Sequence, residues 1–312
     1  MIWCFDADDV VSASKGAALT FSYDAFTTRN IGFVTTEEQA KLRAAQVFVC
    51  GTGGMGGACV FALARMGVGR LILADIDEFE ASNLNRQAFA FRDTIGRHKA
   101  EATRDLCLSI NPEIEIIVYH DDWPDHVNRA VADSVIVVNG TDDLGASLLL
   151  YRTARAQGRA VIDAYASPLP SIYVTQAGDP MPEERLGYPT LDTAWDGLSM
   201  DQRDAAFFQE ATYVILHSSS RHHIDLELAG EVTAGKRSRM SFAPMVMSTG
   251  MLMAYEVANG ILGRPPGADY RGWFLNPYAA RIEHPRNALV AAVIKPVVTR
   301  FLRRMMDEQV RA

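Results

Sequence analysis

The sequence GTGGMGG at residues 51–57 is the feature that most narrows what this chain can fold into. It follows a short apolar run, QVFVC at 46–50, and precedes apolar residues at helical spacing. Gly51, Gly53 and Gly56 match the pattern G-x-G-x-x-G, in which backbone N–H groups of a tight turn and a helix N-terminus receive phosphate oxygens. The stretch therefore predicts a strand, a phosphate-binding turn and a helix.

Apolar runs rich in β-formers alternate with helical patterns from about residue 46 to residue 165. The runs are RLILAD, IEIIVYH, SVIVVNG and RAVIDAY, and helical spacing recurs at about 97–110 and 143–157. Buried strands that alternate with helices are typical of a doubly wound parallel sheet. SIYVTQ then predicts an antiparallel strand. We therefore expect the α/β class, a Rossmann-like doubly wound and mostly parallel sheet with an antiparallel extension and C-terminal helices.

Changes in composition divide the chain into four parts. These are an irregular lead-in, the main α/β domain, a long polar loop that acts as a substrate lid or crossover, and a C-terminal strand with helices, at 1–28, 29–177, 178–241 and 242–312. Loops as long as the third part are usually functional. In the last part, the Met-rich segment 245–263 predicts a core helix, because methionine fills irregular gaps. Two helical pieces are expected around Pro296.

Composition excludes several classes of protein. The 312 residues carry a net charge of −8 and a pI of about 5.4, so general affinity for nucleic acid is not expected. The N-terminus lacks a signal-peptide pattern, and no apolar run reaches the roughly 18 residues of a membrane span. We therefore expect a cytoplasmic protein without membrane contact.

The four cysteines, Cys4, Cys50, Cys59 and Cys107, form no C-x-x-C pair. They predict neither a disulfide framework nor a zinc site. Cys50, Cys59 and Cys107 fall on a predicted buried strand and on helices, so we expect them in the core. Cys4 in the lead-in is a remote candidate for chemistry.

Polar residues beyond the second strand distinguish between two nucleotides. Asp75 ends that strand, where a carboxylate accepts hydrogen bonds from ribose hydroxyls. Asn85, Arg86 and Gln87 follow, and Lys99 begins the next predicted helix. A dinucleotide's pyrophosphate is held largely by the glycine turn, whereas a triphosphate carries more charge and needs fixed cations. The set therefore favours ATP over NAD.

Asp142 follows the strand SVIVVNG, at the edge where doubly wound sheets bind ligands. A carboxylate beside phosphates is most simply a Mg²⁺ ligand. The neighbouring Asp143 is suited to cap the next helix.

Five motifs together, GTGGMGG, ADIDEFEASNLNRQ, IGRHKAEA, INP and GTDD, resemble the adenylating domain of the ThiF/MoeB/ubiquitin-activating-enzyme superfamily. The resemblance is strong over 29–165 and loose over 243–284. It implies an ATP-dependent adenylyltransferase that activates a carboxylate as acyl-AMP and works as a homodimer. It also implies catalytic roles for Arg86, Lys99 and Asp142, the last as Mg²⁺ ligand.

The resemblance gives Arg29 a place at the phosphates, in many relatives from the partner subunit. The residues that it implies in nucleotide binding are Gly51, Gly53, Gly54, Gly56, Asp75, Asp77, Asn83, Asn85 and Gln87.

Departures from the family pattern limit the kinds of reaction that we expect this chain to catalyse. The C-x-x-C pairs that hold structural zinc in many relatives are missing, so no zinc is expected, and no cysteine follows Cys107 to accept an acyl group. The acyl-adenylate is therefore expected to be captured directly. This places the chain beside stand-alone members that modify ribosomally made peptides, as in microcin- and pantocin-type antibiotic maturation, or that cyclise a carboxylate on a tRNA base.

We expect a peptide or small-protein substrate, because the acidic balance and the missing basic tract disfavour tRNA. An NAD-dependent oxidoreductase would leave Arg86, Lys99 and Asp142 without a role. A nucleotide-binding pseudoenzyme is the third alternative.

The stretch HSSSRHHID at 217–225 is interpreted as ordinary loop residues rather than as a metal or acid/base site. That interpretation covers His217, His222 and His223. Arg221 or Arg237 is a candidate for contact with a substrate carboxylate, and Asp163 is a further candidate near the site.

Overall fold

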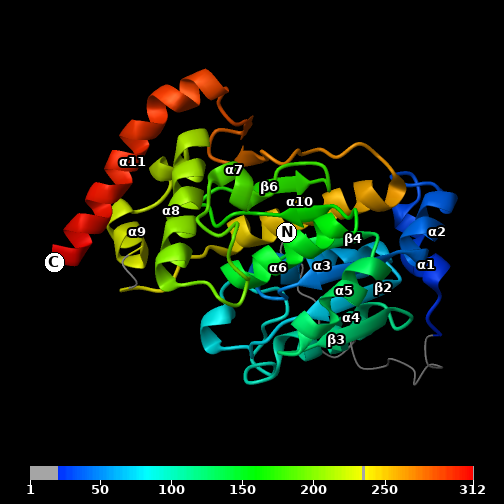
Figure 1. The fold of residues 1–312 in the computed structure, drawn as a ribbon. Helices are drawn as coiled ribbons and strands as arrows, with labels where there is room; N and C mark the ends of the chain where they lie inside the picture. The colour runs from blue at the N-terminus through cyan, green and yellow to red at the C-terminus, as the bar shows by residue number, and fades with distance from the viewer. Residues whose placement is uncertain (1–19, 234–235, 312) are drawn as a thin grey trace, which may run out of the picture.

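A computed structural model describes residues 20–233 and 236–311, and its centre is one eight-stranded sheet (Figure 1). The strand order is β3-β2-β1-β4-β5-β6-β7-β8. The bounds are β1 Gln46–Cys50, β2 Arg70–Ala74, β3 Glu115–Tyr119, β4 Ile136–Asn139, β5 Val161–Asp163, β6 Ser171–Thr175, β7 Trp273–Asn276 and β8 Arg281–Glu283. Neighbours among β1 to β5 pair in parallel, and β6, β7 and β8 pair antiparallel, which confirms the predicted fold class.

The register aligns the carboxyl ends of the central strands. Cys50 at the end of β1 pairs with Ala74 of β2 on one side and with Asn139 of β4 on the other. The loops that follow these three strands therefore leave the sheet at one edge, which is where doubly wound sheets bind ligands.

Helices cover both faces of the sheet. Alternate side chains of β1 point to opposite faces, as in any strand. Val47 and Val49 pack in a core with α3 (Gly54–Met66), α4 (Lys99–Ile110) and α10 (Ala243–Leu262). Phe48 packs in a second core with α5 (Trp123–Asp133) and α6 (Leu144–Ala156). The Met-rich segment is therefore a core helix, as predicted, with Met253 fully buried.

Residues 178–241 are largely helical, so the prediction of a long polar loop was wrong. They form α7 (Pro182–Leu186), α8 (Met200–His217), a 3-10 turn η3 (Ser220–His222) and α9 (Leu226–Thr233). A capping box between Ser199 and Gln202 starts α8. The apolar residues of α8 pack inward, and its polar residues form the outer face. Because of these polar residues, the composition of the segment does not indicate a helix. We call α7, α8 and the residues between them the cap.

Two terminal expectations also need correction. The expected irregular lead-in contains α1 (Tyr23–Thr27), and residues 1–19 lie outside the described residues. α2 (Thr36–Ala44) follows it. The two expected C-terminal pieces form one helix, α11 (Ala288–Arg311), with Pro296 inside it. Packing of Val298 and Leu302 against Leu216 of α8 holds α11 despite the N–H that proline lacks.

None of the helices within 20–233 and 236–311 is long and apolar enough to cross a membrane. The domain boundaries at 28, 177 and 241 remain predictions.

Candidate functional site

The glycine turn at 51–57 is packed so tightly that its glycines have separate roles. Gly51 has a φ of +89°, which an L side chain rarely adopts. A Cβ on Gly56 would lie 1.9 Å from the Gly51 carbonyl oxygen, and one on Gly140 would lie 2.4 Å from the same atom. A Cβ on Gly53 would meet nothing closer than Gln87, at 3.6 Å. Gly51 and Gly56 thus build the turn, and Gly53 leaves room beside it, as a phosphate cradle requires.

Asp75 is fixed by the turn that it faces. Its Oδ2 accepts hydrogen bonds from the backbone N of Thr52 at 2.7 Å and from the Thr52 hydroxyl at 3.1 Å. Its Oδ1 accepts from the backbone N of Asp77 at 3.0 Å. The carboxylate is half-buried and held in one orientation, with oxygen lone pairs left for a ligand hydroxyl.

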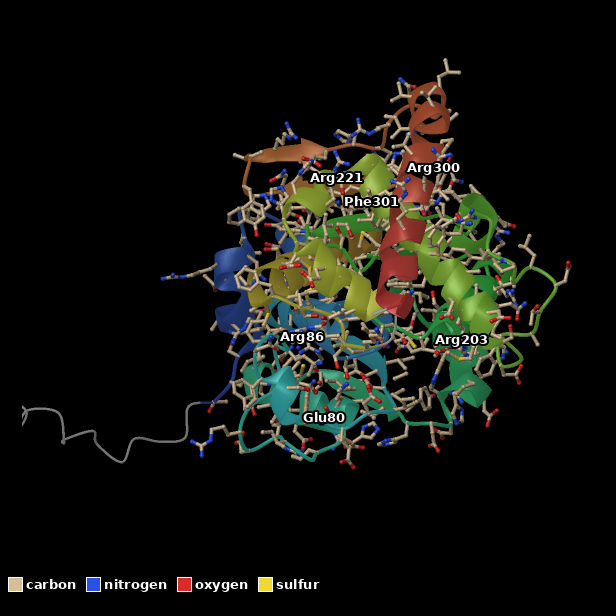
Figure 2. All side chains as sticks on the ribbon, turned by 90° about the vertical axis from the view of Figure 1, so that its left-hand side faces the viewer. Glu80, Arg86, Arg203, Arg221, Arg300 and Phe301 are labelled. Carbon is tan, nitrogen blue, oxygen red and sulfur yellow. The ribbon has the colours of Figure 1, made fainter. Side chains whose placement is uncertain are left out.

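The loop at 80–87 orders its own polar residues. Asn83 is buried, and its Oδ1 accepts from the backbone N of Glu80 at 3.0 Å, so the structure gives Asn83 an internal role in the turn. One guanidinium nitrogen of Arg86 donates to the Ser82 carbonyl and to Asn85 Oδ1, at 2.8 and 2.9 Å. Figure 2 shows Arg86 and Glu80 on the face of the molecule that also carries α9 and α11.

Two amides extend this site. Asn85 Nδ2 donates to the Ser241 carbonyl at 3.2 Å and so ties the loop to the segment before α10. Gln87 is buried beside Gly53, and its Oε1 has no hydrogen-bond partner within the described part of the chain. Gln87 is therefore in place to contact whatever the glycine turn holds.

Lys99 reaches the same edge from the start of α4. Its side chain is 10% exposed, and its ammonium lies 2.8 Å from Asp77 Oδ2, while Asp77 itself is 62% exposed. The backbone N of Lys99 also donates to the Asp77 carbonyl, at 2.8 Å. An ammonium has three donors, so two remain for a second anion.

Asp142 and Asp143 divide the two expected roles between them. Asp143 caps α6 by accepting from the backbone N of Ala146 at 2.8 Å, and it pairs with Arg203 of α8 at 2.6 Å. Asp142 is 85% exposed, with Arg239 at 3.8 Å. No cluster of three or more metal-ligating side chains lies in the described residues. A single free carboxylate does fit Mg²⁺ that also binds phosphates and waters.

The structure places Arg29 away from the other site residues. It is exposed and lies beside Asn30, whose side chain donates to the Met66 carbonyl at the end of α3. The glycine turn is at the opposite end of this helix of 13 residues, about 20 Å away at 1.5 Å per residue. Figure 1 shows α1 and α2 at one end of the molecule and the loop after β2, in cyan, toward the other. Arg29 therefore does not reach the glycine turn of its own chain.

The three described cysteines are buried, as predicted. Burial raises the pKa of Cys107 to about 12 and raises the pKa of Cys50 and Cys59 further. A buried thiol that stays protonated is a poor nucleophile. Cys4 lies outside the described residues.

The histidine-rich stretch is built into the fold and is not one open loop. His217 ends α8, and its Nδ1 accepts from the backbone N of Arg286 at 3.0 Å. Burial, and then the positive charge of Arg185, lower the pKa of His217 to about 4. His223 stacks on Tyr278 with ring centroids 4.3 Å apart, and His222 accepts from Arg221.

The remaining sequence candidates are already engaged. Arg237 pairs with Glu231 at 3.5 Å. Asp163 is buried and accepts from the Tyr151 hydroxyl at 2.9 Å and from the backbone N of Ala164. Burial raises the pKa of Asp163 to about 7.

Sequence reasoning missed two polar groups. His98 immediately precedes Lys99 in the sequence, and its Nε2 lies 2.8 Å from His120 Nδ1. His120 Nε2 in turn lies 3.3 Å from Glu101. Arg185 is enclosed by Tyr165, Tyr173 and Tyr213 under α8. The adjacency of His98 to Lys99 was a usable signal. Nothing in the local sequence distinguishes Arg185 from the neighbouring arginines.

Fold and site together define an α/β protein with a tightly packed glycine turn, a half-buried carboxylate and two basic residues at one sheet edge. The ThiF family model matches residues 27–287, and the chain belongs to the ThiF family. This confirms the resemblance to the ThiF/MoeB/ubiquitin-activating-enzyme superfamily.

Two relatives resemble parts of the chain. The tRNA threonylcarbamoyladenosine dehydratase of Haemophilus influenzae is 38% identical over 122 residues, which cover 38% of this chain and 46% of the relative. The molybdopterin-synthase adenylyltransferase of Salmonella typhimurium is 39% identical over 111 residues, which cover 35% and 44%. The chain thus spans less than half the length of these relatives.

Among solved structures, E. coli MccB has the same fold. Its structure with ATP is 20% identical and its structure with MccA-N7isoASN is 19% identical, each with a TM-score of 0.57. Each match covers 80% of this chain, and 65% and 66% of the respective MccB chain.

Proposed function

We propose that this protein is an ATP-dependent adenylyltransferase that activates a carboxylate. The observation that carries the proposal is the convergence of the glycine turn, Asp75, Arg86, Lys99 and Asp142 at one edge of the sheet. The names of the relatives support it, since the Salmonella protein is an adenylyltransferase. An NAD-dependent oxidoreductase would give no role to the two cations and Asp142.

In the proposed reaction, a carboxylate oxygen of the substrate attacks the α-phosphorus of ATP. The bond from that phosphorus to the bridging oxygen breaks, pyrophosphate leaves with the electron pair, and an acyl-adenylate remains. Negative charge increases on the departing phosphates, and fixed cations stabilise it without reorganising. Arg86 and Lys99 are the cations to which we assign this role, and Arg239 beside Asp142 is a third cation at this edge.

Each residue of the edge has a distinct task in this scheme. Asp75 binds the ribose, and Gln87 orients the phosphates over Gly53. Lys99 exchanges part of its contact with the exposed Asp77 for a phosphate oxygen. Asp142 would hold Mg²⁺, which neutralises phosphate charge when bound. We further propose a homodimer in which Arg29 serves the site of the partner subunit.

The finer proposal is a substrate that is a peptide or small protein, in natural-product maturation in the cytoplasm. MccB, a microcin C7 biosynthetic enzyme, shares the fold and has been crystallised with MccA-N7isoASN. Because all described cysteines are buried, we propose that a nucleophile within the substrate captures the acyl-adenylate directly, by condensation or dehydration.

A tRNA substrate is the second candidate, because two observations favour it. One is the 38% identity to a tRNA-modifying dehydratase. The other is a cluster of exposed cations along one helix, α11, formed by Lys295, Arg300, Arg303 and Arg304. Clustered cations are the footprint of a phosphate backbone.

Pyrophosphate exchange into ATP tests the proposal. The purified protein with Mg²⁺ is assayed against cell-derived peptides and against bulk tRNA, and ATP and NAD binding are compared by calorimetry. Exchange that requires peptide supports the first candidate, and exchange that requires tRNA supports the second. NAD binding without ATP binding would reject adenylation, and ATP binding with no exchange on either substrate would favour a pseudoenzyme.

A further inference from the structure

Arg185 is a half-buried cation with buried nitrogens and no ion-pair partner among the described residues. Two of its nitrogens, Nε and Nη1, are buried without a hydrogen-bond partner in the described part of the chain. Its third nitrogen, Nη2, donates to the neutral hydroxyl of Tyr165 at 2.6 Å. None of the ion pairs between described residues includes Arg185. Buried guanidinium groups are normally paired, so this one calls for an explanation.

An arginine that contacts the cap from α6 shows what a structural pairing looks like here. Arg152 of α6 makes two bonds to the Glu183 carboxylate, at 2.9 and 2.7 Å. Its remaining donors reach the carbonyls of Thr193 and Thr190, both at 2.8 Å. The same segment of chain therefore completes the bonding of one arginine and leaves that of Arg185 incomplete.

The walls around Arg185 are aromatic. Its guanidinium carbon lies 4.6 Å from the ring centre of Tyr213, 5.7 Å from that of Tyr165 and 5.8 Å from that of Tyr173. The Tyr173 hydroxyl is also buried, and it has no hydrogen-bond partner among the residues that the structure describes. Ring faces attract the cation but do not satisfy its N–H groups. Three polar atoms with unmet hydrogen bonds thus meet in one box.

Within the described residues, the carboxyl groups around the box form no ion pair with Arg185. Glu210 is half-buried and accepts from the Tyr188 hydroxyl at 2.7 Å; burial raises its pKa, while the charges of Arg239 and Arg185 lower it. Asp163 is buried with a raised pKa, and His217 faces the cations Arg185, Arg286 and Lys295. The N–H groups of Arg185 are thus left for a further acceptor, such as the oxygen of an anion.

The box adjoins the nucleotide edge through two elements. Tyr165 lies two residues after Asp163, at the carboxyl end of β5, the strand next to β4. Arg203 of α8 binds Asp143, next to Asp142. An anion at Arg185 would therefore lie on the substrate side of the proposed phosphate site.

We infer that Arg185, with Tyr165, Tyr173 and Tyr213, binds a carboxylate group of the substrate that accepts the adenylyl group from ATP. A planar carboxylate has two oxygens that can accept from a guanidinium and from a hydroxyl, which are the donors that this box presents. The identity of the molecule that carries the carboxylate rests on the proposed function. Binding of the carboxylate itself does not, and it is tested without ATP.

The test is a titration of the full-length protein observed by NMR of ¹⁵N-labelled arginine side chains. The probes are N-acetyl-aspartate amide and its neutral analogue N-acetyl-asparagine amide, with inorganic phosphate as a third arm. Arg185→Lys assigns the Nε signal of Arg185. The Nε signal of Arg152 is the internal control, because its donors are already bonded.

We expect the Arg185 signal to shift saturably with the aspartate probe and not with the asparagine probe, while the Arg152 signal stays in place. In Tyr173→Phe, the apparent affinity should fall about three- to tenfold. No saturable shift, or equal shifts with both probes, would overturn the inference and leave Arg185 satisfied by water alone. A stronger response to phosphate would overturn the choice of carboxylate.

The two proposals fail separately. A carboxylate response in a protein that neither binds ATP nor exchanges pyrophosphate would uphold this site and reject the proposed function. ATP-dependent exchange in a protein whose Arg185 signal never responds would do the reverse.

Discussion

Polar groups at the carboxyl edge of the sheet and polar groups under the cap are stabilised in opposite ways. At the edge, Asp142 is 85% exposed and Asp77 62%, so water solvates the charges and local bonds only orient them. Under the cap, Asp163 is buried and Glu210 is half-buried, and burial raises the pKa of both. Substitutions at the edge should therefore change activity with little effect on folding, and substitutions under the cap should change stability and its pH dependence.

The largest effect is expected at Arg152, whose partner Glu183 has a side chain only 2% exposed. Arg152→Met leaves that carboxylate buried and unpaired, which should lower the free energy of unfolding by about 3 kcal/mol. Arg185→Met removes a cation that has no carboxylate partner and should change it by less than about 1 kcal/mol without ligand. Urea unfolding monitored by circular dichroism measures both. Equal losses in the two variants would show that Arg185 is structural.

The next largest effect is expected from removing a charged side chain at the carboxyl edge of the sheet. Arg86→Ala, Lys99→Ala and Asp142→Ala should each lower ATP–pyrophosphate exchange at least about a hundredfold, equivalent to about 2.7 kcal/mol. The matched control is Arg92→Ala, an exposed residue of the same connection, which should retain exchange. Normal exchange in all three variants would remove the proposed mechanism. Unfolding of any one at the same urea concentration as the parent would show that its effect is not a folding defect.

A substitution in the glycine turn is expected to reduce both the stability of the protein and its binding of ATP. In Gly56→Ala, the new methyl group would collide with the Gly51 carbonyl oxygen, at 1.9 Å, so we expect a loss of about 2 kcal/mol in unfolding free energy together with loss of ATP binding. Gly178→Ala is the control, since nothing lies within 4 Å of the added carbon. Calorimetry with ATP and thermal unfolding provide the two readouts. Unchanged ATP affinity in a folded Gly56→Ala protein would separate the turn from nucleotide binding.

The smallest effect concerns pH. The pKa of Asp163 is about 7 in the folded chain against 3.8 ordinarily, so the folded state holds a proton that the unfolded state has released between these values. The contribution of Asp163 to the free energy of unfolding therefore falls as pH rises from about 4 to 7 and is constant above that. Relative to Asp163→Asn, the parent should lose on the order of 1 kcal/mol between pH 6 and 8. Parallel stability curves for the two proteins would contradict the raised pKa.

The sequence predicted the edge well because its signals are local. The glycine turn, the strand that ends before Asp75 and the cap residue Asp143 depend on neighbours within a few positions, and all are in the structure as expected. The position of Arg29 within its own chain could not be predicted, because it depends on how α1 and α2 dock onto the far end of α3. Local motifs predict which strand end a residue follows and not which end of a helix a distant segment covers.

The cap was unpredictable for a related physical reason. Charged residues crowd the first turn of α8, at Asp201, Arg203 and Asp204, whereas buried apolar residues such as Val214 lie near its end. Arg185 differs from Arg152 only in which partners the folded chain brings to it, and no sequence pattern records a missing partner.

The contact between Gly51 and Gly140 also restricts how this chain can change over evolutionary time. A side chain at either position would collide with the backbone of the other, and both are already the smallest residue, so no second substitution can relieve the first. Positions 51 and 140, although 89 residues apart, should therefore remain glycine in every descendant that keeps this turn. A descendant that loses either glycine also loses the geometry of the turn. Once the turn is lost, selection no longer acts to keep Asp142.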